Sequence, residues 1–388
     1  MSKVRIGIIG YGNMGTGHAS YLGKGEVDNA VLAAVCDNNK ARLEKAEQDL
    51  GGGVKYYDDY KKMLAEKAVD LIIIAVPHYF HPVMGMDALK AGVHVLSEKP
   101  IGVYTKNVEE MDAVAKESGL TYSIMFQQRT DPRHKKIKQL LDEGVLGELK
   151  RIVWVVTNWY RSQSYYDSGG WRATWSGEGG GVLINQCPHN LDLWQWFFGM
   201  PERIRGFCGF GKFRDIEVED DVTAYMEYKN GATGTLITTT GETPGSNRLE
   251  ISGDNGKLVF EGGKIILYKT EVSESEFNKN YTGGFGEPKN ERVEIEVTEK
   301  GGAEHKKITQ NTVNNILAGD KLIAAAYEGI NSLTISNAIY LSTWVDAWVD
   351  LPIDKDLFLE ELKKRIASSK SKENIMEATL SLDNSDNI

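Results

Sequence analysis

Cysteine is scarce in this chain of 388 residues. Only Cys36, Cys187 and Cys208 occur, and no two of them have the C-x-x-C spacing of a zinc or redox motif. Disulfide-stabilised folds and structural zinc sites need more cysteines at closer spacing. The composition therefore argues against both, and we expect no bound metal.

Long apolar runs and blocks of basic residues are also missing. No run reaches the ~20 apolar residues that a membrane-spanning helix needs. The opening sequence MSKVRIGIIG enters a strand pattern at once and leaves no room for a secretory signal. The formal net charge of −10 disfavours nucleic acid as a partner. We expect a cytoplasmic protein with neither a membrane nor a nucleic-acid partner.

The first third of the chain alternates β-branched apolar runs with helical patterns, as the βαβ units of a parallel sheet do. Strands are expected at 4–9, 31–36, 54–56, 71–76, 94–97 and 121–125, and crossover helices at 40–50, 81–91 and 107–118. The fold class that this pattern predicts is α/β, with an N-terminal Rossmann domain over residues 1–126 built on a doubly wound parallel sheet.

Beyond residue 126 the pattern changes. A helix is expected at 132–143, longer alternating strands at 151–159, 223–228 and 233–239, a polar loop at 273–289, helical structure from 312 to 348, and a frayed tail over the last dozen residues. Residues 127–388 are thus predicted to form an α+β domain for substrate binding and oligomerisation. Its large, open, mostly antiparallel sheet would leave one face half apolar, so we expect a homodimer or homotetramer formed through that sheet.

A glycine-rich turn directly follows the first strand and opens a helix pattern. It reads Gly10-Tyr11-Gly12-Asn13-Met14-Gly15. Its glycines permit a tight turn and close backbone approach, so that a pyrophosphate can sit on the helix N-terminus. The motif is weak alone, but Asp37 ends the second strand, where its carboxylate can bind a ribose diol. The sequence therefore predicts a dinucleotide site that includes Gly10, Gly12, Asn13, Met14, Gly15 and Asp37.

The acidic residue at the second strand also bears on the choice of cofactor. Asp37 would repel the 2′-phosphate of NADP, so NAD is favoured. Lys40 and Arg42 follow closely and keep NADP open as the less favoured alternative.

Further motifs follow in order along nearly the whole chain. They are Ala75-Val76-Pro77-His78 with His81, Glu98-Lys99-Pro100 after the fifth strand, Gly144-Val145-Leu146-Gly147, Gly170-Trp171-Arg172, Gly179-Gly180-Gly181-Val182-Leu183, the segment around His189, Glu219-Asp220-Asp221-Val222 and Val349-Asp350-Leu351-Pro352. Together with the glycine-rich turn, this series resembles the glucose-fructose oxidoreductase / inositol dehydrogenase / MocA (Gfo/Idh/MocA) family of oxidoreductases.

The resemblance implies that Lys99 lies beside the nicotinamide and the reacting hydroxyl, and the residues agree with this. A lysine at the carboxyl end of a parallel strand points into the crevice where ligands bind, and its ammonium can hydrogen-bond a developing alkoxide. Pro100 is similar to the family's cis-proline turn. The remaining cofactor contacts that the resemblance implies come from Val76, Pro77, His78, His81 and Glu98. A metal held by the two histidines is disfavoured, because no third ligand of matching spacing is evident.

The second half of the expected site surrounds His189. Many members of the family carry an aspartate four residues before this histidine, whereas this chain has Asn185 there. Because an amide cannot take a proton at neutral pH, acid/base catalysis falls to His189 and substrate orientation to Asn185. Asp192 is a further candidate for substrate binding, where it would also orient His189, or it is a carboxylate of the first helical turn.

Four more residues are candidates for substrate binding. Gln127 and Arg129 begin the second domain at the edge of the crevice, where amide and guanidinium donors suit sugar hydroxyls. A polar linker is the alternative for both. Trp171 and Arg172 could reach the nicotinamide or the substrate, or could instead be a packing pair in a lid loop.

The function predicted from these features is hydride transfer between nicotinamide and a secondary hydroxyl of a sugar, glycoside or cyclitol, which makes the chain an NAD(P)-dependent dehydrogenase or reductase acting on CH-OH groups. One alternative is a redox-assisted glycosidase with tightly bound NAD, which oxidises a ring hydroxyl transiently and then eliminates the glycosidic bond. A second is a non-catalytic NAD(H)-binding regulator. The presence of both Lys99 and His189 counts against the regulator.

Overall fold

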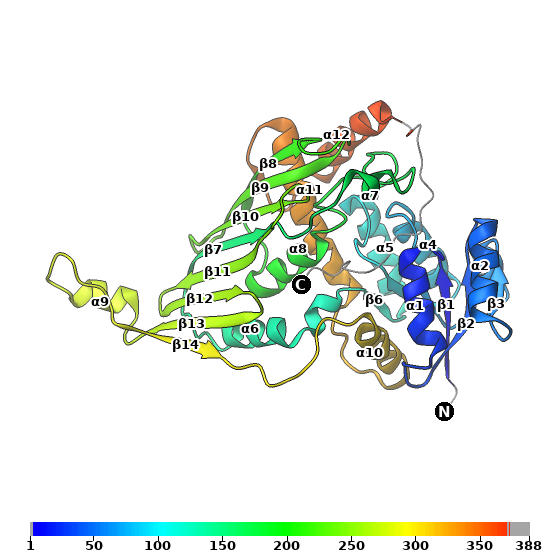
Figure 1. Ribbon diagram of the computed structural model, residues 1–388, viewed down its shortest axis with the longest axis horizontal. Helices are drawn as coiled ribbons and strands as arrows, with labels where there is room; N and C mark the ends of the chain where they lie inside the picture. The colour runs from blue at the N-terminus through cyan, green and yellow to red at the C-terminus, as the bar shows by residue number, and fades with distance from the viewer. Residues whose placement is uncertain (1–2, 371, 373–388) are drawn as a thin grey trace.

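The computed structural model describes residues 3–370 and 372, so the frayed tail expected at the end of the chain lies outside the described residues. Two sheets dominate the molecule, one at each side of the view in Figure 1. The first belongs to the N-terminal half and the second to the C-terminal half. Helices from both halves fill the space between them.

The first sheet has six parallel strands in the order β3-β2-β1-β4-β5-β6. They are β1 (Val4–Ile9), β2 (Ala30–Cys36), β3 (Lys55–Tyr57), β4 (Leu71–Ile74), β5 (His94–Ser97) and β6 (Tyr122–Ile124). Leu71 to Ile74 are fully buried, as expected of a parallel strand covered on both faces. The predicted Rossmann sheet is therefore confirmed, and its strand order reverses direction between β1 and β4, where ligands of such sheets bind.

Five helices connect these strands. They are α1 (Asn13–Gly23), α2 (Lys40–Leu50), α3 (Tyr60–Ala65), α4 (Phe80–Lys90) and α5 (Thr105–Ser118). Asn39 and Asp59 accept hydrogen bonds from backbone amides at the starts of α2 and α3, which explains why these two helices begin where they do.

The second sheet has nine strands in the order β14-β13-β12-β11-β7-β10-β9-β8-β15. They are β7 (Leu149–Val156), β8 (Arg203–Phe210), β9 (Glu219–Glu227), β10 (Thr233–Thr239), β11 (Asn247–Gly253), β12 (Gly256–Glu261), β13 (Lys264–Thr270), β14 (Asn290–Ile295) and β15 (Val349–Asp350). Strands β7 and β10 pair in parallel, and the other neighbours are antiparallel. The predicted open, mostly antiparallel sheet is thus confirmed.

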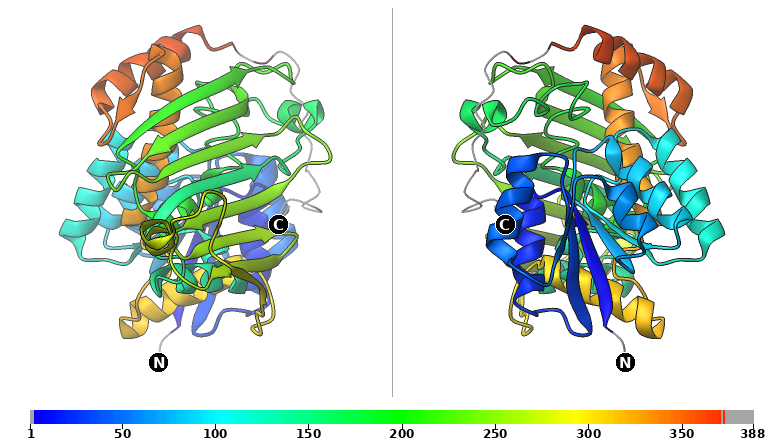
Figure 2. Two further views of the ribbon diagram at one scale, coloured as in Figure 1. Left: turned by 90° about the vertical axis from the view of Figure 1, so that its left-hand side faces the viewer. Right: turned by 90° about the vertical axis from the view of Figure 1, so that its right-hand side faces the viewer.

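One face of the second sheet packs on helices α6 (Pro132–Asp142), α8 (Pro188–Phe198) and α11 (Gly329–Val345). Trp154 of β7 stacks on Trp194 of α8, with ring centroids 6.4 Å apart. Gly234 of β10 leaves room for this ring, because a Cβ there would lie 2.5 Å from Trp194. The opposite face, seen in the left view of Figure 2, is not covered by these helices.

The C-terminal part of the chain returns to the Rossmann sheet. Helix α10 (His305–Ala318) packs near α1, where the Tyr21 hydroxyl lies 2.8 Å from Thr309 Oγ1. Next to η2 (Ala326–Glu328), the backbone amide of Ile124 in β6 donates to the carbonyl of Ala324. Helix α12 (Lys355–Ser368) contacts α5. These contacts join the C-terminal half of the chain to the Rossmann half.

Two expectations for this part of the chain were wrong in detail. The polar stretch 273–289, predicted to be a loop, contains α9 (Glu274–Asn280), whose N-cap Ser273 accepts from the amide of Glu276. Figure 1 shows α9 at the end of an arm that β13 and β14 extend away from the molecule. The helical stretch predicted from 312 to 348 is α10 and α11 with an interruption, because Gly319 ends α10 in the left-handed conformation.

No helix within residues 3–370 is long and apolar enough to cross a membrane.

Candidate active site

The glycine-rich turn after β1 has the shape that a bound pyrophosphate requires. Gly10 has φ +96°, and a Cβ on it would lie 2.3 Å from the carbonyl oxygen of Ala75. A Cβ on Gly15 would lie 1.8 Å from the carbonyl oxygen of Gly10, whereas a Cβ on Gly12 would meet nothing within 4 Å. The first and third glycines thus allow close packing, and the second faces open space where a ligand can approach. Helix α1 begins next at Asn13 and has no side-chain cap, so its N-terminus is free to bind an anion.

Asp37 is held beside this turn by two backbone amides. Its Oδ2 accepts from the amide of Tyr11 at 2.7 Å, and its Oδ1 accepts from the amide of Asn39 at 2.8 Å. Each carboxylate oxygen can accept a second hydrogen bond. The geometry is therefore compatible with the predicted ribose contact, which stays a prediction.

Lys99 follows β5 and reaches across to the second half of the chain. Its Nζ donates a hydrogen bond to the backbone carbonyl oxygen of Asn185 at 2.8 Å. Burial lowers the pKa of the Lys99 ammonium, although the negative charges of Glu98 and Glu178 oppose this shift. The Lys99-Pro100 peptide bond is cis, as in the turn that the resemblance implied.

Glu98 and His81 support the ends of the strands. Glu98 is buried and lies 2.7 Å from His18 Nε2. Burial alone would raise the pKa of the Glu98 carboxyl, but the hydrogen bond with His18 and the charge interactions with His18, His305 and Lys99 together outweigh burial and bring the pKa to about 2. The two ring nitrogens of His81 each lie 2.7 Å from a carbonyl oxygen, that of Val76 or that of Pro100. The polar groups of both residues thus have protein partners, and their cofactor contacts stay a prediction.

His78 joins the first half of the chain to the loop that carries Trp171. His78 Nδ1 lies 3.1 Å from the carbonyl oxygen of Glu178, and its ring packs edge-on against Trp171 at 5.6 Å. Arg172 donates to the Tyr165 hydroxyl at 2.9 Å. Trp171 and Arg172 are both partly exposed. Within the described part of the chain, no group of three or more His, Cys, Asp or Glu side chains is arranged to hold a metal ion.

His189 lies in the first turn of α8 and is 5% exposed. Its Nε2 is 3.2 Å from Gln127 Nε2, whereas its Nδ1 is buried and has no partner among the residues that the structure describes. Burial lowers the pKa of the imidazole well below its usual range, and the charge of Lys99 adds to this effect. Within the described ranges, the side-chain oxygens of Gln127 and Gln186 are likewise buried without partners. Unpaired buried polar atoms are costly, and a ligand rich in hydroxyl groups could satisfy such atoms.

Arg129 and Asp192 bind each other, a contact that the sequence did not predict. They form a fully buried two-pronged ion pair with each other, at 2.8 and 2.6 Å, and Arg129 also binds Glu328 at 2.6 Å. Asp192 thus contacts Arg129 and not His189. Because both charged groups are already paired inside the protein, we interpret them as a structural element and omit them from the substrate contacts.

Comparison with known proteins identifies the family. The oxidoreductase family with an NAD-binding Rossmann fold matches residues 4–126, and the GFO/IDH/MocA C-terminal domain matches residues 134–259. The chain belongs to the Gfo/Idh/MocA family. It is therefore an NAD-binding oxidoreductase, in agreement with the predicted family and cofactor.

Individual members of the Gfo/Idh/MocA family resemble the chain over most of its length. Myo-inositol 2-dehydrogenase of Thermotoga maritima is 26% identical over 261 residues, which cover 66% of this chain and 74% of that protein. D-glucoside 3-dehydrogenase of Escherichia coli is 29% identical over 248 residues, covering 59% and 68%. The crystal structure of WlbA dehydrogenase from Bordetella pertussis, in complex with NADH and UDP-GlcNAcA, has a TM-score of 0.76 at 26% identity and covers 91% of this chain and 100% of that one.

Two residues of this Gfo/Idh/MocA site were not found from the sequence. Tyr165 lies on the short helix α7 (Gln163–Asp167), and its hydroxyl is within 3.3 Å of the side-chain nitrogens of Asn185 and Gln186. Glu178 is buried beside Asn185 and binds its side-chain amide. Glu178 directly precedes Gly179-Gly180-Gly181, but no spacing rule distinguishes a lone glutamate there from a surface residue.

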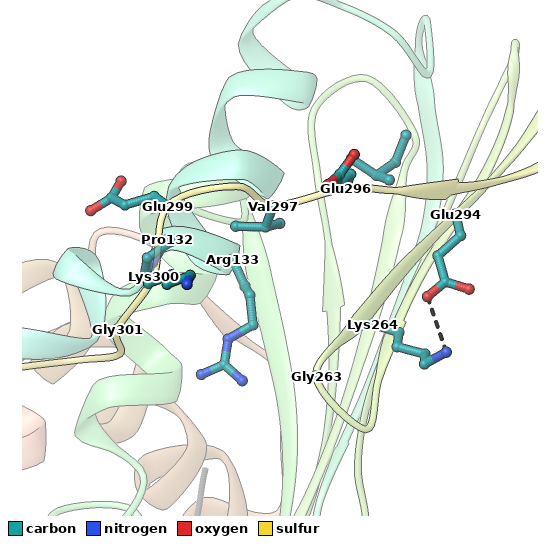
Figure 3. A pocket seen from close by; sticks show the side chains of 11 residues that line it. Pro132, Arg133, Gly263, Lys264, Glu294, Glu296, Val297, Glu299, Lys300 and Gly301 are labelled. Atoms are coloured by element: carbon teal, nitrogen blue, oxygen red, sulfur yellow. Dashed lines mark ion pairs between the residues drawn. The ribbon is translucent and has the colours of Figure 1, made fainter.

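A separate surface hollow of about 520 Å³ lies between the start of α6 and strands β13 and β14. Figure 3 shows that side chains of both charges line it, including an ion pair between Lys264 and Glu294 at 3.0 Å. None of the predicted site residues lines this hollow. Because charges of both signs are interspersed along it, the hollow offers no concentrated charge to a ligand, and we do not assign it a function.

Proposed function

We propose that this chain is an NAD-dependent dehydrogenase that moves a hydride between the nicotinamide and the carbon of a secondary hydroxyl in a sugar, glycoside or cyclitol. The observation that carries the proposal is the contact between Lys99 and Asn185, 2.8 Å from Nζ to the backbone oxygen. It brings a cation from the carboxyl end of β5 to the segment that carries His189. Alcohol oxidation requires a cation to stabilise the developing negative charge, a base to take the proton and a group to orient the substrate, and this arrangement brings such groups together.

Each residue has a separate task in this proposal. Bound NAD+ supplies the acceptor for the hydride. Lys99 hydrogen-bonds the hydroxyl oxygen and stabilises the negative charge that develops on it. His189 takes the hydroxyl proton, because burial keeps its imidazole neutral and able to accept one. Asn185 orients the substrate, and the same groups serve the reverse reaction.

The substrate-facing groups are predominantly uncharged. Asn185, Gln127 and Gln186 are amides, and the partly exposed Trp171 and Tyr165 offer aromatic faces. Amides suit hydroxyl groups, and aromatic rings suit the apolar face of a sugar ring. The relatives named above act on inositol and on D-glucoside. These observations together support a polyhydroxylated ring as the substrate class.

The test is a screen of the purified protein with NAD+ and a panel of sugars, cyclitols and aryl glycosides. NADH absorbance and aglycone release are followed in parallel, with Lys99→Met as the control variant. We expect NADH formation with at least one ring polyol and none with Lys99→Met. Aglycone release without net NADH formation would indicate a redox-assisted glycosidase instead. NAD binding with no turnover of any kind would indicate a regulator.

The division into residues 1–126 and 127–388 remains our proposal for the two domains, and we further propose that the second mediates assembly into a homodimer or homotetramer. On the face of the second sheet turned away from the helices, Val153 pairs with Thr235 and Val155 with Ile237, and all four are partly exposed. Phe207 on β8 is 55% exposed. An apolar face of this kind is typical of a subunit interface.

A further inference from the structure

Glu178 is a buried carboxylate without a positive partner in contact. Its side chain is 1% exposed. One oxygen accepts from the backbone amide of Ala173 at 2.5 Å, and the other accepts from Asn185 Nδ2. Within residues 3–370 and 372, no lysine, arginine or histidine forms an ion pair with Glu178, and burial raises the pKa of its carboxyl. Such a group is costly to bury, so its retention calls for a reason beyond packing.

The contact with Glu178 fixes the orientation of the Asn185 amide. Glu178 accepts from Asn185 Nδ2, so the nitrogen of the amide and not its oxygen faces Glu178. The second hydrogen on Nδ2 points to the Tyr165 hydroxyl at 3.3 Å. Both donors of the amide are thereby used within the protein. Asn185 is partly exposed, and the polar atom that it has left to offer is Oδ1.

We propose that Glu178 is a positioning residue that makes Asn185 a hydrogen-bond acceptor for a substrate hydroxyl. Without Glu178 the amide could rotate by 180° and present a donor in place of an acceptor. With Glu178 present, Oδ1 belongs to the same residue whose backbone oxygen binds the Lys99 ammonium. Lys99 donates to the reacting oxygen, and Asn185 accepts from a second hydroxyl group of the substrate. An ether or carbonyl oxygen in place of that second hydroxyl could not donate to Asn185 and would bind less well. This inference rests on the proposed oxidation of a polyhydroxylated ring.

The pairing can be tested by exchanging the two functional groups. In Glu178→Gln the amide of Asn185 is free to take either orientation, and we expect KM for the substrate to rise roughly 3- to 10-fold with kcat nearly unchanged. In Asn185→Asp two carboxylates come into contact, and we expect kcat/KM to fall at least ~10-fold together with the thermal midpoint. In the double variant Glu178→Gln/Asn185→Asp, the new glutamine amide can donate to the new carboxylate while its oxygen still accepts from Ala173.

The double variant should therefore recover most of the kcat/KM and of the thermal midpoint lost in Asn185→Asp. The matched control is Glu217→Gln, which alters a carboxylate that accepts from the amide of Trp175 at 2.6 Å and has no bond to Asn185. Its KM should stay at the wild-type value. If the effects of the two single substitutions simply add in the double variant, for both kcat/KM and the thermal midpoint, the positioning role of Glu178 is overturned.

Thermal midpoints of the protein without substrate separate this inference from the proposed function. Recovery of the midpoint in the double variant supports the pairing even if no ring polyol is ever oxidised, in which case only the proposed function fails. Turnover of a ring polyol with a Glu178→Gln variant whose KM equals that of wild type would uphold the proposed function and refute the role of Glu178.

Discussion

Lys99 Nζ donates its hydrogen bond to the main-chain carbonyl of Asn185, 86 residues away in sequence, and not to the side chain of that residue. The ammonium is thus located by a backbone atom that no substitution at position 185 removes, other than through a change of fold. The Asn185 side chain meanwhile binds Glu178 and Tyr165. In the proposed mechanism, polarisation of the substrate oxygen and orientation of the substrate therefore depend on different atoms, so that mutations should separate them.

Substitutions at Lys99 and Asn185 should accordingly affect different steps. Lys99→Met removes the cation, and we expect the rate of hydride transfer to fall by ~10²-fold or more. Asn185→Ala keeps the carbonyl that holds Lys99, and we expect mainly a weaker substrate affinity, by about 0.5 to 1.5 kcal/mol. Single-turnover kinetics measures both quantities. An Asn185→Ala variant that loses as much in hydride transfer as Lys99→Met would show that the two roles are not separable.

The pH dependence of oxidation should show how the positive charge of Lys99 affects the pKa of His189. As a base His189 must be neutral, and burial together with the Lys99 charge lowers its pKa below the usual value of about 6.5. The acid limb of kcat/KM should then lie below pH ~6.5. Removing the positive charge in Lys99→Met raises the pKa of His189, so the limb should move to higher pH.

Lys99→Arg is the matched control for this shift, because it keeps the charge while changing the geometry. Its acid limb should stay close to that of wild type even if its rate is lower. A limb that does not move in Lys99→Met, or a His189→Ala enzyme that oxidises at the wild-type rate, would remove His189 from the role of base.

The sequence was a good guide to features with a local pattern. The six strands of the Rossmann sheet follow from β-branched runs, and a residue at the carboxyl end of such a strand, such as Lys99, must lie at the ligand-binding edge. The alternating strands likewise indicated the open sheet. Helix α9 could also have been found, because Ser273 before Glu274 and Glu276 is an N-terminal helix signal.

Contacts between residues far apart in sequence could not be predicted in this way. Arg129 and Asp192 are 63 residues apart, and each alone looks like a polar group available to a sugar. Only the fold shows that they neutralise each other in the interior. The same holds for Glu178, since nothing in its neighbourhood along the chain indicates that its partner is the side chain of Asn185.

The buried ion pair predicts a loss of stability rather than a loss of substrate affinity. Asp192→Asn leaves Arg129 buried with Glu328 as its remaining carboxylate partner, and we expect the free energy of unfolding to fall by about 3 kcal/mol. Denaturant titration measures this change. Asp142→Asn, which breaks an exposed pair with Lys138, should cost less than about 1 kcal/mol. An Asp192→Asn protein with unchanged stability and a raised KM would return Asp192 to the substrate site.

The uncovered face of the second sheet predicts an oligomer. Light scattering at micromolar concentration should give a dimer or tetramer. Ile237→Lys would introduce a charge in the middle of the partly exposed face, next to Val155, and should shift the protein toward monomer. Lys90→Glu reverses an exposed charge on α4, in the Rossmann half of the molecule, and is the control. A monomeric wild-type protein at these concentrations would contradict the assignment of this face.

The last prediction concerns the preference for NAD over NADP. Because the amides of Tyr11 and Asn39 hold the Asp37 carboxylate at the end of β2, its negative charge is fixed where the adenosine ribose of a dinucleotide would lie. A 2′-phosphate there meets an unfavourable charge, so NAD should bind at least ~10-fold more tightly than NADP, which corresponds to about 1.4 kcal/mol. Asp37→Asn removes the charge but keeps an oxygen that can accept from one of the two amides, and calorimetry should show the affinity ratio approach one, chiefly through better binding of NADP.

Lys40→Ala is the control, since the side chain of Lys40 is 91% exposed and near Glu44, so that its loss should leave both affinities unchanged. Equal affinities of the wild-type protein for the two cofactors would remove Asp37 from this role, and a large loss of NADP binding in Lys40→Ala would indicate that the basic residues of α2 select the cofactor instead.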